Sequence, residues 1–499
     1  MMKGRGASDP ELVIDAALDA RDAGRGEAAL PLLKAALADH PRNPRLWQTL
    51  GVVCRALEES AAAIDAFAEA ARLAPGDLKP AYGVAQASLE AGRPATALFE
   101  RARALAPGDG SLLLGRAAAQ LAEGRIDDAI AALDAVVLGN PLWLEGQATL
   151  ARLRWLTGDR GAFAAGYRRA LAAMPASEVL WLELIRLLIE VKRYADAMAV
   201  ISEARGAIDT PDILAPLEAV CASELGETTQ ADRLFAALGD RADIATVERH
   251  LRHLLRTGRP DAASALAQPW LGQDQDHRIW PYVSLAWRLT GNDRIEWLEG
   301  DPALIGVIDM DVADRLASLA DRLRALHNTA SAPLGQSVRG GTQTDGPLFA
   351  REEPEIRVLR AAVVDAVARH IDQIGAHDAA HPVRRHVGRR FRFAGSWSVR
   401  LTGAGHHSNH IHPQGWFSSA LYISLPPQEA MGPEPGGWLQ LGAPPSELGL
   451  DLQAYRTIEP RPGRLILFPS TMWHGTVPFM SGERLTVAFD VAAAGAAAG

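Results

Sequence analysis

Histidines are concentrated at one place in the chain. Four of the 14 histidines lie within seven residues, in the segment GHHSNHIHP at 405–413. They are His406, His407, His410 and His412. Residues i and i+2 of an extended segment point to the same side, so His410 and His412 would present two imidazoles on one face. His474 follows at the end of an apolar stretch, and three histidines at strand ends motivate the hypothesis of a metal site.

An arginine and a hydroxyl follow His474 at short intervals. Arg484 lies ten residues after His474, and Thr486 lies two residues further on. On a strand these two side chains would face the same side and reach one pocket. A guanidinium suits a buried carboxylate, because its planar fork donates two parallel hydrogen bonds. A merely solvated or core patch of histidines would leave His474 and Arg484 unexplained.

The elements that must hold these residues are short strands. The last third of the chain contains alternating segments that are rich in β-branched or aromatic residues and bounded by proline or glycine. They span 389–402, 417–425, 437–442, 464–470 and 484–492. Strands of this length and spacing predict a sandwich or jelly roll, a scaffold shared with cupins. We also expect two helices, near 311–327 and 354–374.

The amino-terminal half is organised as a repeat. Prolines recur every 32 to 36 residues, which would interrupt any single long helix. They are Pro41, Pro75, Pro107, Pro141, Pro175 and Pro211. The stretch ending at Pro75 resembles a tetratricopeptide repeat at Trp47, Leu50, Gly51, Cys54, Ala63, Phe67, Ala70 and Pro75. Helix pairs that bury their apolar faces only by stacking on neighbours are expected over roughly 8–240.

The sequence therefore predicts a multidomain chain, an all-α tetratricopeptide solenoid followed by a jelly-roll domain with flanking helices. We place the solenoid at 1–240, a helical cap or bridge at 241–295 and the strand-rich domain at 296–499. Trp280 and Trp287 in the bridge are interpreted as packing residues. A solenoid of this kind usually binds a protein or peptide, although it could also only stiffen or dimerise the protein.

The strand-rich domain resembles the 2-oxoglutarate and Fe(II)-dependent oxygenases. The segments that carry the resemblance are HIHPQGWFSSALYISLP at 410–426, PGRLILFPSTMWH at 462–474 and RLTVAFD at 484–490. The chain is most similar to a bacterial group in which tetratricopeptide repeats precede the catalytic domain. The resemblance implies a double-stranded β-helix fold, with Fe(II), 2-oxoglutarate and O2 as cofactors and co-substrates.

The resemblance also implies roles for individual residues. His410 matches the first metal ligand, and His474 matches the distal histidine. Arg484 matches the residue that binds the distal carboxylate of 2-oxoglutarate, with Thr486 as its hydroxyl partner and Tyr422 on the same carboxylate. An open facial triad leaves three positions on the metal for the oxo-acid and dioxygen. The implied reaction hydroxylates a C–H bond and releases succinate and carbon dioxide.

The second metal ligand departs from the family pattern. The usual Asp or Glu is replaced by His412. Three interpretations stay open at this point. His412 is a neutral third ligand, or two histidines suffice and water fills the gap, or His407 or a distant carboxylate completes the site.

Other candidates carry less information. The glycine-rich segment SVRGGTQT at 337–344 lacks the features of a phosphate-binding loop, and we expect a turn there, with a substrate or lid loop as the alternative. Trp416 and Trp473 adjoin the segments that bear the ligands and are expected to shape the substrate mouth. Trp397 and Trp438 are more typical of barrel filling.

Composition excludes several classes of protein. The 499-residue chain has a net charge of −9, so a broad basic surface for nucleic acid is not expected. No apolar run approaches the roughly 18 residues of a membrane span. Two cysteines make neither a disulfide framework nor a zinc site, which favours a cytoplasmic location. The oligomeric state is left unassigned.

Two functions from different classes follow from these observations. The first is an oxygenase that hydroxylates a protein or peptide recruited by the repeats. The second is an interaction scaffold whose carboxy-terminal domain is inactive or cupin-like. The presence of Arg484 and Thr486 favours the oxygenase, because a pure scaffold needs neither.

Overall fold

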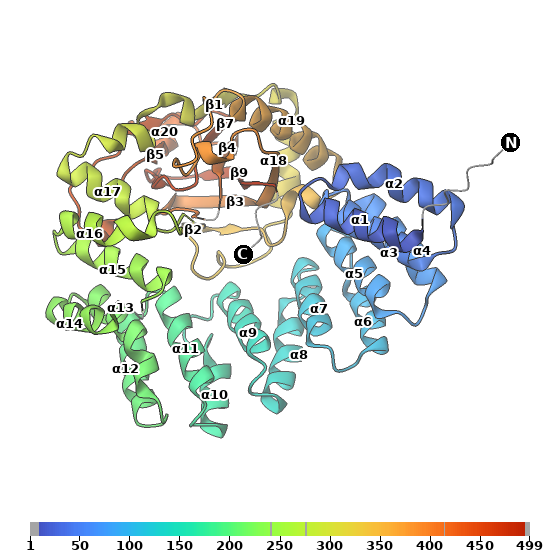
Figure 1. Cartoon of the computed structure of the whole chain (residues 1–499), viewed down its shortest axis with the longest axis horizontal. Helices are drawn as coiled ribbons and strands as arrows, with labels where there is room; N and C mark the ends of the chain where they lie inside the picture. Colours follow the sequence, from blue (N-terminus) through green and yellow to red (C-terminus); the bar gives the residue numbers. More distant parts are fainter. Residues whose placement is uncertain (1–8, 240–241, 275–276, 414, 495–499) are drawn as a thin grey trace.

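The computed structural model describes residues 9–239, 242–274, 277–413 and 415–494. The first half is an array of antiparallel helix pairs, which forms an arc beneath a domain built of sheets (Figure 1). The pairs are α1 (Pro10–Asp22) with α2 (Gly26–Asp39), α3 (Pro44–Ala56) with α4 (Ser60–Leu73), α5 (Leu78–Glu90) with α6 (Thr96–Leu105), α7 (Gly110–Ala122) with α8 (Ile126–Gly139), α9 (Leu144–Leu156) with α10 (Ala165–Ala173), α11 (Glu178–Glu190) with α12 (Tyr194–Arg205), and α13 (Ala215–Leu225) with α14 (Thr228–Leu238).

Small residues allow neighbouring helices of the array to approach closely. A Cβ atom added at Gly51 on α3 or at Gly83 on α5 would lie 2.7 Å or 2.5 Å from the ring of Phe67 on α4. Only glycine fits beside this ring at both positions. The prolines also have a repeated role, because Trp47 and Trp181 each donate a hydrogen bond of 2.8 Å to the carbonyl oxygen of the proline six residues earlier.

A second helical segment links the array to the sheets. It consists of α15 (Ile244–Arg256), α16 (Pro260–Ala267) and α17 (Trp280–Thr290). Trp280 and Trp287 on α17 are buried and pack edge to face, which confirms their interpretation as packing residues. Leu448 and Trp473 from the carboxy-terminal domain belong to the same apolar core. The bridge is thus packed directly on the domain that follows it.

The carboxy-terminal domain contains two antiparallel sheets. The larger sheet has the strand order β1 (Gly306–Asp309), β7 (Arg464–Pro469), β4 (Phe417–Ser424), β9 (Glu483–Ala493), β3 (Phe391–His407) and β2 (Val338–Gln343). The smaller sheet has the order β6 (Arg456–Ile458), β5 (Leu439–Leu441) and β8 (His474–Thr476). A short helix, α20 (Gln428–Met431), precedes β5.

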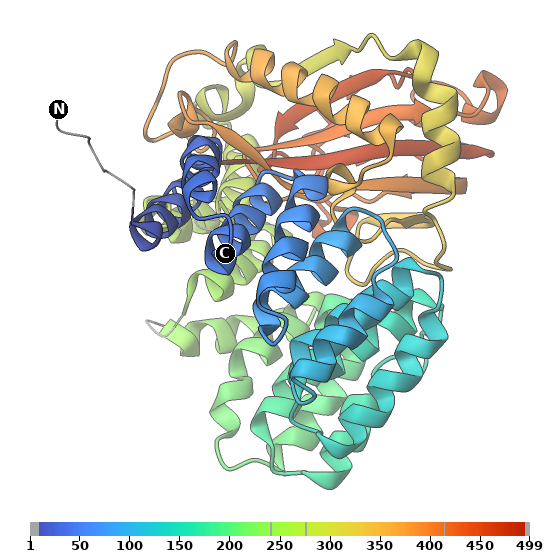
Figure 2. The ribbon, with the colours of Figure 1, turned by 90° about the vertical axis from the view of Figure 1, so that its right-hand side faces the viewer.

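The two faces of the larger sheet differ in chemistry. Along β9, Leu485, Val487 and Phe489 belong to an apolar core shared with α18 (Leu316–Arg324) and α19 (Pro354–Ile371). Figure 2 shows α19 lying across this side of the sheet. The alternate residues of β9 face the smaller sheet and line a cavity between the two sheets. The strand alternation therefore places hydrophobic residues against the helices and functional residues toward the cavity.

The expected fold class is confirmed as a helical tetratricopeptide-like solenoid followed by an antiparallel sheet domain. The five predicted strands and the helix near 354–374 are present, whereas the helix expected at 311–327 is shorter and spans only α18. The prediction of a turn at 337–344 is wrong, because this segment forms β2 at the edge of the sheet. Its glycines allow this course, since Gly340 has a φ of +71° and the register shifts between Arg339 and Gly341.

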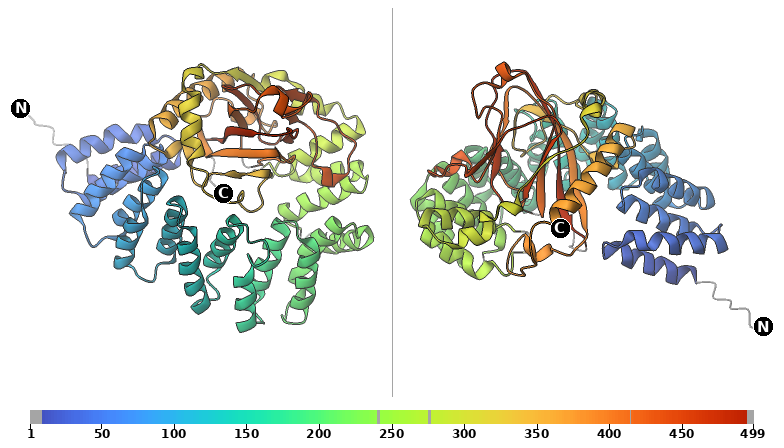
Figure 3. Two further views of the ribbon diagram at one scale, coloured as in Figure 1. Left: turned by 180° about the vertical axis from the view of Figure 1, so that it is seen from behind. Right: turned by 90° about the horizontal axis from the view of Figure 1, so that it is seen from above.

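The turns within successive helix pairs contact the carboxy-terminal domain. Contacts of this kind occur at the turns from α3–α4 to α11–α12, which lie side by side along the upper edge of the arc (Figures 1 and 3). They are Arg360 with Glu58 at 2.9 Å, Glu352 N with Ala91 O at 3.2 Å, Asn328 Nδ2 with Leu121 O at 3.1 Å, Ala330 N with Leu156 O at 3.2 Å, and Lys192 with Glu447. The solenoid thus packs against the carboxy-terminal domain along this edge.

None of the helices among the described residues is long and apolar enough to cross a membrane. We propose the division into 1–240, 241–295 and 296–499 as the domain organisation; residues 240 and 241, at the first boundary, lie outside the described residues.

Candidate metal centre

Three imidazoles meet in the cavity between the sheets. His410, His412 and His474 each place one ring nitrogen within 4.8 Å of the other two. The main chains of His410 and His474 are directly paired, with N–O distances of 2.9 and 3.0 Å. This bridge fixes one histidine before β4 against the first residue of β8. Segments 64 residues apart in the chain are thereby joined at the site.

The hydrogen bonds of the three rings give them the same tautomer, although the ring planes are inclined to one another by 41° to 49°. Nδ1 of His410 donates to the carbonyl oxygen of Ser408 at 2.9 Å, and Nδ1 of His474 donates to that of Met472 at 3.0 Å. Nδ1 of His412 donates to Oδ2 of Asp490 at 2.7 Å. Because each Nδ1 carries a hydrogen, each neutral ring presents an Nε2 lone pair rather than an N–H to the cavity, and that of His410 accepts from the hydroxyl of Ser337 at 3.1 Å. This is the arrangement of histidine ligands whose second nitrogen is held by an outer partner.

Charge at the site is unevenly distributed. Burial, together with the neighbouring imidazoles, holds the pKa of His410 and His474 well below the ordinary value. Burial also opposes a charge on His412, but the Asp490 carboxylate outweighs it and raises the pKa of His412. The second oxygen of Asp490 accepts a hydrogen bond of 2.6 Å from the hydroxyl of Ser418. Asp490 is therefore held in place on both sides.

A buried cation lies in the same cavity. Arg484 is 1% exposed and donates to Gly437 O at 2.9 Å and to Thr476 Oγ1 at 3.1 Å. Its Nε and the hydroxyl of the buried Tyr422 have no hydrogen-bond partner among the described residues. Burial lowers the pKa of Arg484, because no carboxylate in the described part of the chain pairs with it. Thr486 lines the cavity beside it.

Unpaired polar groups inside a protein carry a large desolvation penalty. A guanidinium Nε and a phenol hydroxyl that both lack a partner among the described residues therefore fit a bound carboxylate, which would accept from both. Three Nε2 lone pairs fit a divalent transition metal. The donor set thus suits both Fe(II) and the distal carboxylate of 2-oxoglutarate.

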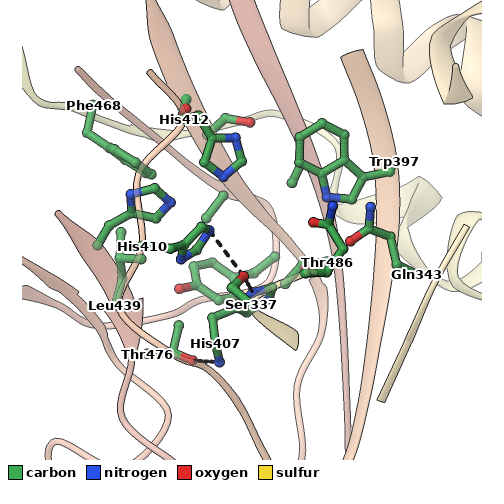
Figure 4. Close-up of a pocket in the computed structure, with 18 of the residues that line it drawn as sticks. Ser337, Gln343, Trp397, His407, His410, His412, Leu439, Phe468, Thr476 and Thr486 are labelled. Atoms are coloured by element: carbon green, nitrogen blue, oxygen red, sulfur yellow. Dashed lines mark hydrogen bonds between the residues drawn. The ribbon is translucent and has the colours of Figure 1, made fainter. Parts of the chain in front are cut away.

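His407 lies beside the three histidines but outside their cluster. Its Nδ1 is 3.1 Å from the hydroxyl of Ser337, which also lies 3.1 Å from Nε2 of His410 (Figure 4). Burial, reinforced by Arg484, lowers the pKa of His407 to about 3, so this ring is neutral. Ser337 therefore connects the two rings by hydrogen bonds at the edge of the cavity.

Comparison with known proteins identifies both halves of the chain. Residues 395–490 match the family described as "Putative 2OG-Fe(II) oxygenase", and residues 14–77 and 94–153 match tetratricopeptide repeat families. The chain joins tetratricopeptide repeats to a domain of this oxygenase family. No curated protein matches it.

Solved structures resemble each half separately. The repeat protein MamA 41-end from Desulfovibrio magneticus RS-1 is 18% identical, with a TM-score of 0.30, over 36% of this chain and 99% of its own. The collagen prolyl hydroxylase of Paramecium Bursaria Chlorella virus-1 is 15% identical, with a TM-score of 0.26, over 38% and 95%. A prolyl-4-hydroxylase from Pseudomonas putida is 18% identical, with a TM-score of 0.27, over 38% and 92%.

Two tryptophans of the oxygenase domain lie elsewhere than expected. Trp416 is buried against His386 and Phe417 in the core beneath the helices. Trp473 is buried in the bridge, where its Nε1 donates to Pro281 O at 2.9 Å. The expectation that they shape the substrate mouth is wrong, because the cavity is lined instead by Ser418, two residues after Trp416, and by His474, next to Trp473.

Trp397 and Asp490 lie at the site although the sequence analysis interpreted Trp397 as barrel filling and gave Asp490 no role. Trp397 lines the cavity, and its ring lies parallel to that of His412 with centroids 5.8 Å apart. Asp490 lies on the same face of β9 as Arg484 and Thr486, at positions i, i+2 and i+6. Strand alternation from Arg484 would have pointed to Asp490, and the pairing of Trp397 with Ala488 places that tryptophan on the same face.

Proposed function

We propose that this protein is a 2-oxoglutarate- and Fe(II)-dependent oxygenase that hydroxylates a protein or peptide. The observation that carries the proposal is a buried arginine that has no carboxylate partner among the described residues and lies in the same cavity as three imidazoles whose Nδ1 atoms all donate to outer acceptors. A purely structural core would gain nothing from this charge, because an unpaired buried cation is costly. The match of residues 395–490 to the oxygenase family supports the same function.

In this proposal His410, His412 and His474 hold Fe(II) through Nε2. Arg484, Thr486 and Tyr422 hold the distal carboxylate of 2-oxoglutarate. When bound, the metal and its co-substrates supply the oxidation, in which one oxygen atom enters the substrate and 2-oxoglutarate leaves as succinate and carbon dioxide. His412 thereby takes the position of the usual carboxylate ligand.

The protein's own residues orient and shield these groups. The acceptors at Ser408, Met472 and Asp490 fix each imidazole as its Nδ1–H tautomer, so no ring must reorient on metal binding. Arg484 is already anchored by Gly437 and Thr476, which leaves its Nε for the ligand. Apolar residues of both sheets, among them Leu439 and Phe468, exclude water from the cavity.

A macromolecular substrate is proposed from the repeats. Arrays of this kind present extended binding surfaces, and here the array is fixed against the domain that holds the candidate metal centre. Both units can therefore contact one ligand at the same time.

The direct test is succinate formation by the purified full-length protein with Fe(II), ascorbate and 2-oxoglutarate. We expect slow turnover without a substrate and mass increases of one oxygen atom in peptides that are substrates. Arg484→Ala should lose this turnover and still bind iron. If the parent protein binds neither Fe(II) nor 2-oxoglutarate in calorimetry, the interaction scaffold becomes the better account.

A further inference from the structure

A groove opens at the mouth of the histidine cavity. Its volume is about 680 Å³, within the range of roughly 300–1,000 Å³ of ligand sites. Gln336, Ser337, Trp397, His410 and His412 line both the groove and the inner cavity, so the two are continuous. A ligand lying in the groove has a direct path to the imidazoles.

The walls of the groove come from separate units of the chain. Lys192 belongs to the turn between α11 and α12 of the solenoid, and Arg278 belongs to the bridge. Residues 408–413 and Trp397 of the oxygenase domain form the opposite side. A ligand that touches both walls contacts the repeats and the candidate metal centre together, which requires an elongated molecule rather than a small one.

Positive charge gathers in this groove although the whole chain is acidic. Lys192, Arg278 and Arg339 line it, whereas the chain as a whole has a net charge of −9. Lys192 pairs with Glu447 and Arg278 pairs with Glu248 at 3.1 Å, and neither glutamate lines the groove. Arg339 is exposed and donates to the main-chain oxygens of Gln336 and Val338, which orient the guanidinium without neutralising its charge.

The carboxylate that does line the groove is already engaged. Asp490 accepts hydrogen bonds from His412 and Ser418, and its side chain is 16% exposed. An incoming ligand therefore meets Arg339, which has no carboxylate partner among the described residues, and two further cations whose partners Glu447 and Glu248 lie outside the lining of the groove. Local positive charge on an acidic protein selects for negatively charged partners and disfavours basic ones.

We infer that this groove binds an extended acidic segment of a polypeptide and passes one of its side chains beside Trp397 to the metal centre. The inference rests on the proposed function and adds the class of substrate to it. Trp397 provides a flat ring next to His412 at the junction of groove and cavity, which suits an inserted side chain. Acidic residues on either side of that side chain would pair with Arg339 and compete with Glu447 for Lys192.

The test is binding, measured by fluorescence anisotropy with the full-length protein without iron or 2-oxoglutarate. The probes are three labelled pools of degenerate decapeptides, enriched in glutamate, in glutamine or in lysine. We expect the acidic pool to bind at least about tenfold more tightly than the other two, with an affinity that falls as salt rises. Arg339→Glu and Lys192→Glu should each lower the affinity for the acidic pool by about tenfold.

Arg461→Glu is the matched control, because Arg461 is an exposed arginine of the same domain that does not line the groove. Equal affinities for the three pools, no binding of any pool, or the same affinity in Arg339→Glu and Arg461→Glu would overturn the inference. If glutarate displaced the labelled acidic pool as strongly as the unlabelled acidic pool does, the groove would bind small anions, and the inference would also be overturned.

Failure of the proposed function is distinguishable from failure of this inference. A protein that prefers the acidic pool but forms no succinate with Fe(II) and 2-oxoglutarate would refute the oxygenase alone. A protein that forms succinate and shows no preference among the pools would refute the acidic substrate alone.

Discussion

Nδ1 of His412 donates a hydrogen bond of 2.7 Å to the carboxylate of Asp490, so the acidic group that is missing from the H-x-H motif lies directly behind it. The hydroxyl of Ser418 holds the other oxygen of that carboxylate at 2.6 Å. An outer carboxylate fixes the tautomer of a ligating histidine and makes its free nitrogen a stronger donor. The negative charge that a carboxylate at position 412 would carry is thus found on Asp490, which contacts the far side of the His412 ring.

Asp490→Asn should lower the affinity for the metal without abolishing binding. An asparagine can still accept from His412 through its amide oxygen, but it lacks the charge. Loss of an outer partner of this kind typically costs 10–100-fold in metal affinity, and we expect about that loss for Fe(II) or Co(II) in calorimetry. Asp451→Asn, at an exposed position of the same domain, is the control. Unchanged affinity in Asp490→Asn would show that His412 needs no outer carboxylate.

Metal binding should depend on pH through His412. A proton on Nε2 competes with the metal, and Asp490 favours that proton by raising the pKa of His412 above the ordinary 6.5. Affinity should therefore fall as the pH drops below this raised pKa, while His410 and His474, whose pKa values are low, remain neutral. In Asp490→Asn the fall should begin at a lower pH. Titrations with Co(II) between about pH 5 and 8 measure this, and identical profiles would contradict it.

Substitutions at His412 separate the three interpretations of the motif. If His412 is a ligand, His412→Leu should abolish uncoupled succinate formation, because leucine cannot coordinate. His412→Asp brings a second carboxylate next to Asp490, so we expect the double variant with Asp490→Asn to bind Fe(II) more tightly than His412→Asp alone. Calorimetry checks the order of the affinities. An active His412→Leu variant would indicate that two histidines suffice.

Arg484 should control the affinity for 2-oxoglutarate and not that for iron. Removing a buried guanidinium leaves the partner carboxylate desolvated, and a loss of about 2.7 kcal/mol corresponds to roughly 10²-fold in KM. Arg484→Ala should show this increase, and Arg484→Lys should restore only part, because an ammonium cannot form the bidentate pair. Arg400→Ala is the control, since Arg400 lies on the neighbouring strand and pairs with Glu483 at 2.6 Å. Equal KM values in Arg484→Ala and Arg400→Ala would contradict the assignment of Arg484 to the carboxylate of 2-oxoglutarate.

The sequence predicted the parts of the site that depend on local periodicity. Proline intervals located the helix pairs, and alternation on one strand brought Arg484 and Thr486 to one pocket. Asp490 was missed because its contact with His412 joins residues 78 apart, and that pairing depends on strand order in the sheet. Trp416 was misplaced for the same reason. Trp416 and Phe417 both belong to the apolar core beneath the helices, and the cavity is lined by the next residue, Ser418.

The packing of the two halves is the other feature that local patterns did not predict. Leu334 precedes β2 in the chain, yet its side chain is buried in the apolar core formed by α9 to α12. Ala330 N is bonded to Leu156 O in the same region. The oxygenase domain therefore contributes a core residue to the repeats, and a chain cut near residue 240 would leave Leu334 exposed.

Leu334→Ala should therefore destabilise the whole protein rather than a surface loop. Truncating a buried leucine typically costs about 2–5 kcal/mol, and Leu334 is 6% exposed. We expect a loss of this size in the free energy of unfolding, measured by urea denaturation with tryptophan fluorescence. Leu138→Ala, at a position that is 70% exposed, should change it by less than about 0.5 kcal/mol. Equal effects of the two substitutions would mean that the contact at Leu334 does not hold the solenoid and the oxygenase domain together, and the groove between them would then lack a fixed width.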